Sequence, residues 1–128
     1  KVIVYSYSDG KLKELQSIAA DNANARGGAD IHVSPDGMFV YASTRLKGDG
    51  ITIFRVGNKG TLTRVGAQLT GKHPRNFAIT PNGNFLLVAC RDDNSIQVYS
   101  RDKDTGLLKN THQDIVLSHP VCVKFYPE

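Results

Sequence analysis

The sequence has 128 residues, of which 40% are hydrophobic and 22% charged, a balance typical of a folded globular protein and unlike that of a disordered chain. Sixteen Lys and Arg against twelve Asp and Glu give a net charge of +4, but the basic residues are scattered and aromatic residues are few, so we expect no nucleic-acid partner. No apolar run approaches the ~20 residues needed to cross a bilayer, so we expect no membrane partner.

The sequence repeats itself with a period of 46 residues. Residues 28–45 align with residues 74–91, so that Arg45 matches Arg91. Self-similarity at a period of this length is typical of repeat architectures.

In chain order, the sequence predicts a half-unit over residues 1–25, full units over 28–70 and 73–117, and one further strand over 119–128. Within the first full unit, apolar and β-branched runs bounded by turn residues predict four strands. These strands cover residues 30–33, 38–43, 51–56 and 62–69. No window has a 3.6-residue apolar period, so we expect almost no helix.

Four strands in each repeat are characteristic of a β-propeller blade. The sequence therefore predicts an all-β chain of β-propeller blades, each with four antiparallel strands. At about 2.8 units, the chain forms an incomplete ring, because propellers close with roughly four to eight blades. We expect the remainder of a propeller chain, or another copy, to cover the open blade faces.

The two cysteines, Cys90 and Cys122, stand in apolar surroundings without the CxxC or Cys-His spacing of a zinc site. We therefore expect two buried free thiols, no metal and no cofactor. The first residues of the chain look like a strand and lack the layout of a signal peptide, and we expect a cytoplasmic protein.

Strand order places one set of polar residues together. In a four-stranded meander, the loop entering the first strand and the loop leaving the second lie on the same rim, beside the central channel. The residues that this places on one rim are Arg45, His73, Arg75, Asn76 and Arg91. Arginine clamps carboxylates and phosphates through two parallel hydrogen bonds, so we expect these residues to bind an anionic substrate. The alternative is that the arginines pair with Asp30, Asp92 or Asp93 and tie blades together.

His32 is the candidate catalytic residue for proton transfer. The next unit has Ala78 at the equivalent position, so the fold does not require a histidine there. The alternative is a histidine that is merely packed within a strand.

Repetition separates structural residues from functional ones on the rim. His73 recurs before a proline as His119, which favours a structural role for it. Arg75 does not recur, since its counterparts are Ala29 and Val121. Its lack of repetition favours a role at the mouth of the channel.

The run "PRNFAITPNG" at residues 74–83 and the ending "PVCVKF" at 120–125 closely resemble the C-terminal blades of the seven-bladed propeller lactonases. That family includes 6-phosphogluconolactonase and the 3-carboxy-cis,cis-muconate lactonizing enzyme. The resemblance implies the C-terminal portion of a metal-independent hydrolase of anionic sugar lactones in carbohydrate metabolism. It also implies that Arg75 binds the anion, with Arg45 a weaker candidate. The family's proposed catalytic His and Glu belong to earlier blades and have no matched position here.

Three other readings stay open. The family also contains lactonizing cycloisomerases, and fold alone does not exclude a non-catalytic propeller that binds a ligand or a protein. The third reading is that these 128 residues form a piece without activity of its own.

Overall fold

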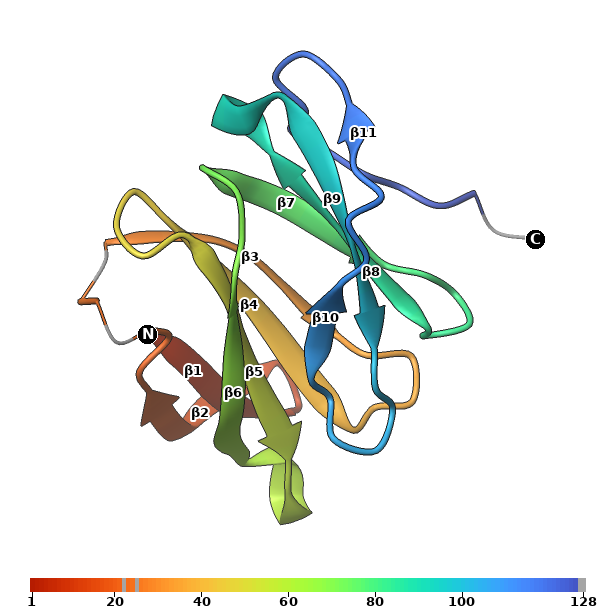
Figure 1. Ribbon diagram of the computed structural model, residues 1–128. Helices are drawn as coiled ribbons and strands as arrows, with labels where there is room; N and C mark the ends of the chain where they lie inside the picture. The colour runs from red at the N-terminus through yellow and green to blue at the C-terminus, as the bar shows by residue number, and fades with distance from the viewer. Residues whose placement is uncertain (22, 25, 127–128) are drawn as a thin grey trace.

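The computed structural model describes residues 1–21, 23–24 and 26–126. It contains three antiparallel β-sheets that follow one another in chain order (Figure 1). The first sheet consists of β1 (Val2–Ser8) and β2 (Lys11–Ile18). The second consists of β3 (Gly27–Val33), β4 (Phe39–Arg45), β5 (Gly50–Val56) and β6 (Leu62–Leu69). The third consists of β7 (Pro74–Ile79), β8 (Phe85–Cys90), β9 (Ser95–Arg101), β10 (Leu108–Asn110) and the short β11 (Ile115–Val116), which pairs with β9.

The predicted all-β architecture is confirmed. The second sheet has the spatial order β3-β4-β5-β6 and the third continues as β7-β8-β9-β10, the meander of two consecutive propeller blades. Helix in the described residues is limited to two three-residue 3₁₀ segments, η1 (Asn58–Gly60) and η2 (Arg91–Asp93). Three of the predicted strands in the first full unit differ in their bounds. β3 begins at Gly27 instead of residue 30, because its ladder continues past an irregularity between Gly28 and Ile31. β4 runs from Phe39 to Arg45 instead of 38–43, and β5 begins at Gly50 instead of residue 51.

The division of the chain into units stays a prediction at its two ends. Residues 22 and 25 of the first half-unit and 127–128 of the last strand lie outside the described residues. Residues 119–126 are in no strand, because no strand among the described residues forms a ladder with them.

The core lies between the sheets, and β4 contributes to it on both faces. Phe39 and Tyr41 point to the third sheet, where they join a cluster with Phe77 and Tyr99. Val40 and its neighbours on the opposite face pack in a second cluster toward β1 and β2. A strand that is buried on both faces is apolar along its length, which is why polar and apolar side chains do not alternate over residues 38–43.

The cysteine prediction is half right. Cys90 is buried, and burial raises the pKa of its thiol to about 12. Cys122 is exposed, so the expectation of a second buried thiol is wrong. The reason is its place in the terminal segment, which no neighbouring strand of the described chain covers.

A buried arginine joins the two complete blades on the rim that carries their Pro-Asp-Gly and Pro-Asn-Gly turns. The Arg101 side chain has no exposed surface, and its Nη2 donates to Asp36 Oδ2 at 2.7 Å. Its Nε donates to the Tyr41 hydroxyl at 2.8 Å and its Nη1 to the Gly83 carbonyl at 3.0 Å. All three guanidinium nitrogens are therefore paired, and the charge is compensated.

We predict that Arg101→Met lowers the free energy of unfolding by about 1.5–3 kcal/mol, because it removes a charge-assisted hydrogen bond to Asp36 and the hydrogen bonds to Tyr41 and Gly83. Chemical denaturation measures the loss. Arg55→Ala is the matched control, because Arg55 occupies the equivalent position one repeat earlier and is only half-buried. Equal losses in the two variants would contradict the role given to Arg101.

The same contact predicts a loss of stability in acid. Partial burial raises the pKa of Asp36, but hydrogen bonds from Ser34, the Met38 N–H and Arg101 outweigh it and bring the pKa to about 2. A carboxylate with a lowered pKa stabilises the fold above its ordinary pKa of 3.8, and this stabilisation is lost as the pH falls toward 2. Thermal unfolding measured between about pH 5 and about pH 2, where carboxylates titrate, should show a melting temperature that falls with the pH. In Asp36→Asn this fall should be smaller.

Candidate functional site

The register of two strand pairs brings predicted site residues to one rim. Gly27 at the start of β3 lies opposite Arg45 at the end of β4. Pro74 at the start of β7 lies opposite Cys90 at the end of β8. The entry to each inner strand thus sits beside the exit from the second strand, as the meander predicts. We call this edge the arginine rim. It comprises Arg45, His73, Arg75, Arg91 and Asp92.

His73 lies between two arginines of the rim. Arg45 Nη1 is 3.1 Å from His73 Nε2, and Arg91 Nη2 is 3.4 Å from His73 Nδ1. A guanidinium only donates hydrogen bonds, so the Arg45 contact requires a lone pair on Nε2. The longer Arg91 contact would require a lone pair on Nδ1 as well, and a neutral imidazole has only one acceptor nitrogen. We assign the hydrogen bond to the shorter Arg45 contact, so that a neutral His73 carries its proton on Nδ1, 3.5 Å from Asp92 Oδ2, and Arg91 only lies beside the ring.

The burial of His73 and the positive charges around it both favour the neutral imidazole. The residue is 6% exposed and has a φ of 59° in the left-handed region. Burial lowers the pKa of the imidazole, and the charge of Arg91 lowers it further. Asp92 opposes these effects, while Arg45 and Arg75 add to them. The neutral ring accepts from an arginine of one blade and lies beside an arginine of the next.

Arg75 has an unengaged guanidinium. It is exposed, and its side chain makes no hydrogen bond or ion pair with any of the residues that the structure describes. It falls at the irregularity of the β7–β8 ladder between Pro74 and Asn76. Such irregularities re-aim a side chain, and this one leaves Arg75 available to a ligand at the rim.

Asp30 connects the inner strands β3 and β7. Its Oδ2 accepts hydrogen bonds from Asn76 Nδ2 at 2.6 Å and from the Phe77 N–H at 3.2 Å. The same oxygen lies 3.0 Å from His32 Nε2. Asn76 Oδ1 in turn accepts a hydrogen bond from the Val123 N–H at 2.7 Å. Both polar atoms of the Asn76 amide therefore join β7 to other segments, one to β3 and one to the segment 119–126.

His32 packs against Phe77 and keeps one ring nitrogen available as a proton acceptor. Its ring meets Phe77 edge to face, with centroids 4.8 Å apart and an interplanar angle of 78°. When Nε2 donates to Asp30, Nδ1 has the lone pair that a proton acceptor needs. The side chain is 35% exposed and borders a hollow of about 240 Å³ that also touches Val123.

The structure thus places the predicted site residues in two groups. Arg45, His73 and Arg91 are in direct contact, and the charge of Arg75 acts on the same imidazole. His32 and Asn76 meet instead at Asp30, which the sequence suggested only as a partner for an arginine. The signal for Asp30 is its position, since it lies 46 residues before Asn76 in the repeat. The roles in substrate binding and proton transfer stay predictions.

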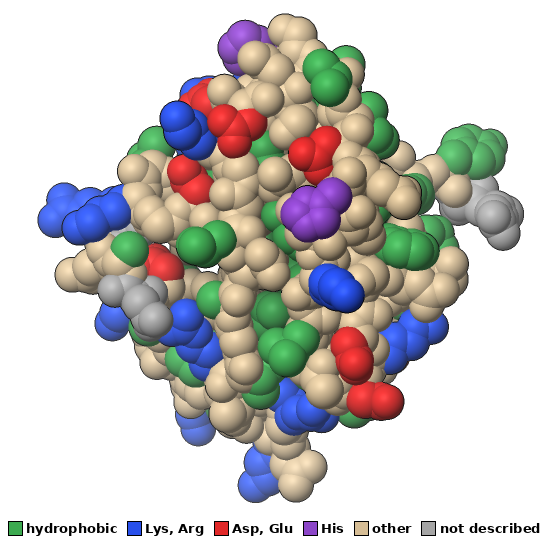
Figure 2. All heavy atoms as spheres, viewed as in Figure 1, with side chains coloured by type: hydrophobic (Ala, Val, Ile, Leu, Met, Phe, Trp, Pro, Cys, Tyr) green, Lys and Arg blue, Asp and Glu red, His purple; other side chains and the backbone are tan. Residues whose placement is uncertain are grey.

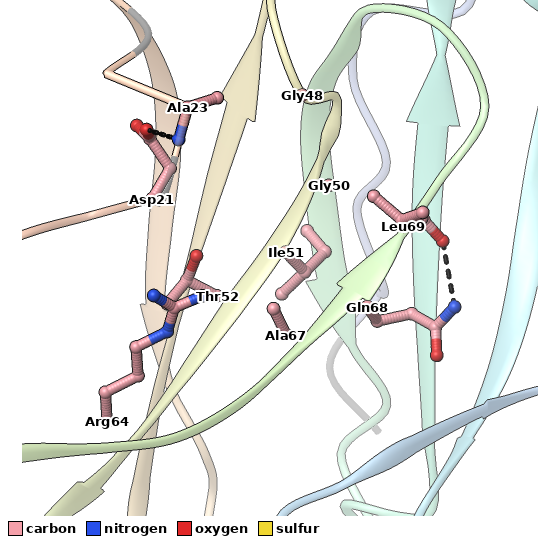
Figure 3. Close-up of a pocket in the computed structure, with 10 residues that line it drawn as sticks. All are labelled: Asp21, Ala23, Gly48, Gly50, Ile51, Thr52, Arg64, Ala67, Gln68 and Leu69. Atoms are coloured by element: carbon pink, nitrogen blue, oxygen red, sulfur yellow. Dashed lines mark hydrogen bonds between the residues drawn. The ribbon is translucent and has the colours of Figure 1, made fainter.

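A further pocket, of about 280 Å³, lies at the outer part of the first complete blade (Figure 3). It contains none of the predicted site residues. Its lining residues are Asp21, Ala23, Gly48, Gly50, Ile51, Thr52, Arg64, Ala67, Gln68 and Leu69. These come from β5, β6 and the segments beside them, on the side of the blade away from the inner strands.

Charged side chains of both signs are spread over the face seen in Figure 2, with hydrophobic side chains between them. Among residues 1–21, 23–24 and 26–126, no three His, Cys, Asp or Glu side chains form a group that could hold a metal ion. The helical segments that the structure describes are all too short to cross a bilayer.

Comparison with known proteins identifies the family. The model of the lactonase family of seven-bladed β-propellers matches residues 1–125. The chain belongs to this family. It is 43% identical to the 6-phosphogluconolactonase of Formosa agariphila and 33% identical to that of Bacillus subtilis, over 92% and 94% of its own length.

Solved structures agree with this assignment. A protein structure from Bacteroides fragilis matches 98% of the chain with a TM-score of 0.95 and 59% identity. The periplasmic gluconolactonase of Pseudomonas aeruginosa matches 98% with a TM-score of 0.89 and 28% identity. The chain spans only 35% and 36% of the lengths of the two curated relatives, and 35% of the Bacteroides structure. The predicted partial propeller is thus confirmed.

We predict that NMR of the imidazole nitrogens will show His73 as the Nδ1–H tautomer, with a pKa below its ordinary value of 6.5. In the unfolded chain His73 has its ordinary pKa of 6.5, so it binds a proton at a higher pH than in the folded chain. The free energy of unfolding should therefore fall as the pH drops below 6.5. The exposed His112 serves as an internal reference. A charged His73 at neutral pH, or a proton on Nε2, would contradict the arrangement of the rim.

Proposed function

We propose that this chain is part of a propeller that hydrolyses an anionic sugar lactone, with 6-phosphogluconolactone as the leading substrate. Two of its relatives are named 6-phosphogluconolactonases. The observation that carries the proposal is the free guanidinium of Arg75 on a rim that holds two further arginines. A dianionic phosphate suits such a rim, because guanidinium groups bind phosphate oxygens in pairs.

In this proposal Arg75 binds the phosphate and Arg45 supports it from the preceding blade. Arg45 Nη1 is held by His73, which fixes the guanidinium in place. Binding the phosphate positions the lactone carbonyl for attack by water, and a well-oriented substrate reacts faster because less entropy is lost in the transition state.

The reaction needs one proton acceptor and one proton donor. The water oxygen bonds to the carbonyl carbon, the ring C–O bond breaks, one water proton passes to the ring oxygen, and the other leaves the new carboxylic acid. Within this chain, His32 is the candidate that takes up a proton, through Nδ1. Asp30 orients the ring through its contact with Nε2.

The open faces of the first and last sheets belong to the same proposal. Several large hydrophobic side chains are exposed there. On β1 and β2 they are Ile3, Tyr5, Tyr7, Leu12 and Leu15. Exposed apolar area of this kind marks an interaction surface, and we assign it to the other blades of a closed ring.

We predict that the full-length protein hydrolyses 6-phosphogluconolactone and that Arg75→Ala raises KM by about 10- to 100-fold, since it removes charge-assisted hydrogen bonds. Arg75→Lys should lose less, because it keeps the charge without the paired donors. Steady-state kinetics measure both. Lys103→Ala is the control, because it removes an exposed positive charge beyond the other ends of the strands. Unchanged kinetics for Arg75→Ala would exclude the assigned site, and a wild-type protein without lactonase activity would favour a non-catalytic propeller.

A further inference from the structure

Two arginine–histidine pairs occupy equivalent positions in the repeat. Arg45 matches Arg91, and His73 matches His119, so each histidine follows its arginine by 28 positions. Arg45 crosses the blade boundary and contacts His73 at 3.1 Å. The repeat therefore predicts an equivalent crossing from Arg91 to His119.

Within the described residues, Arg91 makes a different contact. Its Nε donates to Asp92 Oδ1 at 2.8 Å, and its Nη2 turns back toward His73. His119 contacts the Ser118 hydroxyl at 3.1 Å instead. The cause is local, because Asp92 stands beside Arg91 at the position where the preceding blade has Leu46.

The Arg91–Asp92 pair lies within reach of a ligand. The Arg91 and Asp92 side chains are 39% and 42% exposed. The Asp92 carboxylate also lies 3.5 Å from His73 Nδ1, so it contacts the same cationic surface that an anionic ligand would use. A carboxylate in this place occupies the Arg91 guanidinium, which an anionic ligand would otherwise contact.

We propose that Asp92 is a specificity-determining residue of the arginine rim: it holds Arg91 as its own ion pair and so limits the affinity of the rim for phosphorylated ligands. Arg75 and Arg45 then remain as the arginines that meet the ligand. This inference rests on the proposed function insofar as the rim is taken to be the anion site.

The test compares two substrates in the full-length protein. Asp92→Asn should lower KM for 6-phosphogluconolactone by about fivefold, the upper range for a partly exposed ion pair. KM for unphosphorylated gluconolactone should stay unchanged, because that substrate carries no charge. The difference should shrink in high salt, since mobile ions screen exposed charges. No fall in KM for the phosphorylated lactone, or an equal fall for both lactones, would overturn the proposal.

A matched control separates this local effect from net charge. Asp104→Asn makes the same charge change in an exposed loop between β9 and β10, away from the rim, and should leave both KM values as they are. The double variant Asp92→Asn/Arg91→Gln tests whether Asp92 acts through Arg91. The fall in KM caused by Asp92→Asn should disappear when Arg91 is absent. A gain that persists in the double variant would mean that Asp92 does not act through Arg91.

The affinity for 6-phosphogluconate, the product, tests the role of Asp92 even if the protein does not turn over the lactone. Calorimetry should show tighter binding to Asp92→Asn than to the wild type. If the wild-type protein hydrolyses neither lactone, the proposed function fails, and tighter product binding would still support the assignment of Asp92. Equal binding by the two proteins would overturn it whether or not the protein is a lactonase.

Discussion

One hydrogen bond, repeated along the chain, fixes β7 relative to β3 and the segment 119–126 relative to β7. Asp30 accepts it from the Phe77 N–H, and Asn76 accepts its equivalent from the Val123 N–H, both over 47 residues of chain. A buried or half-buried backbone N–H needs such a partner. Because β7 is held to β3 in this way, the bulge that carries Arg75 has a defined place beside the blade before it.

The two rims of the blades use arginine in opposite ways. On one rim Arg101 is buried with every nitrogen paired, which ties the blades and leaves nothing for a ligand. On the other rim Arg75 is exposed without a partner, and Arg45 is held by a neutral histidine. The first arrangement stabilises the fold, and the second keeps positive charge available at the surface. This contrast is the physical basis for placing the anion site on the rim of Arg75.

The sequence predicts the fold because the repeat shows the same pattern of turns and strands twice. Strands that are buried on both faces also appear as continuous apolar runs, such as residues 38–43. The sequence also placed Arg45, His73 and Arg91 on one rim, since strand order determines which loops meet. It left open whether the arginines face a ligand or pair with aspartates, and only the local geometry shows that Arg91 pairs with Asp92 while Arg75 pairs with no described residue. Nor did it find the exposure of Cys122, because an apolar run alone does not show that no described strand pairs with residues 119–126.

The central claim is that Arg75 binds the anionic group of a sugar lactone or its product. A crystal structure of the full-length protein with 6-phosphogluconate tests this claim most directly. We predict phosphate oxygens within hydrogen-bonding distance of the Arg75 guanidinium, with Arg45 on the same side and the sugar directed toward the channel. A phosphate bound elsewhere on the ring, with Arg75 still free, would contradict the account.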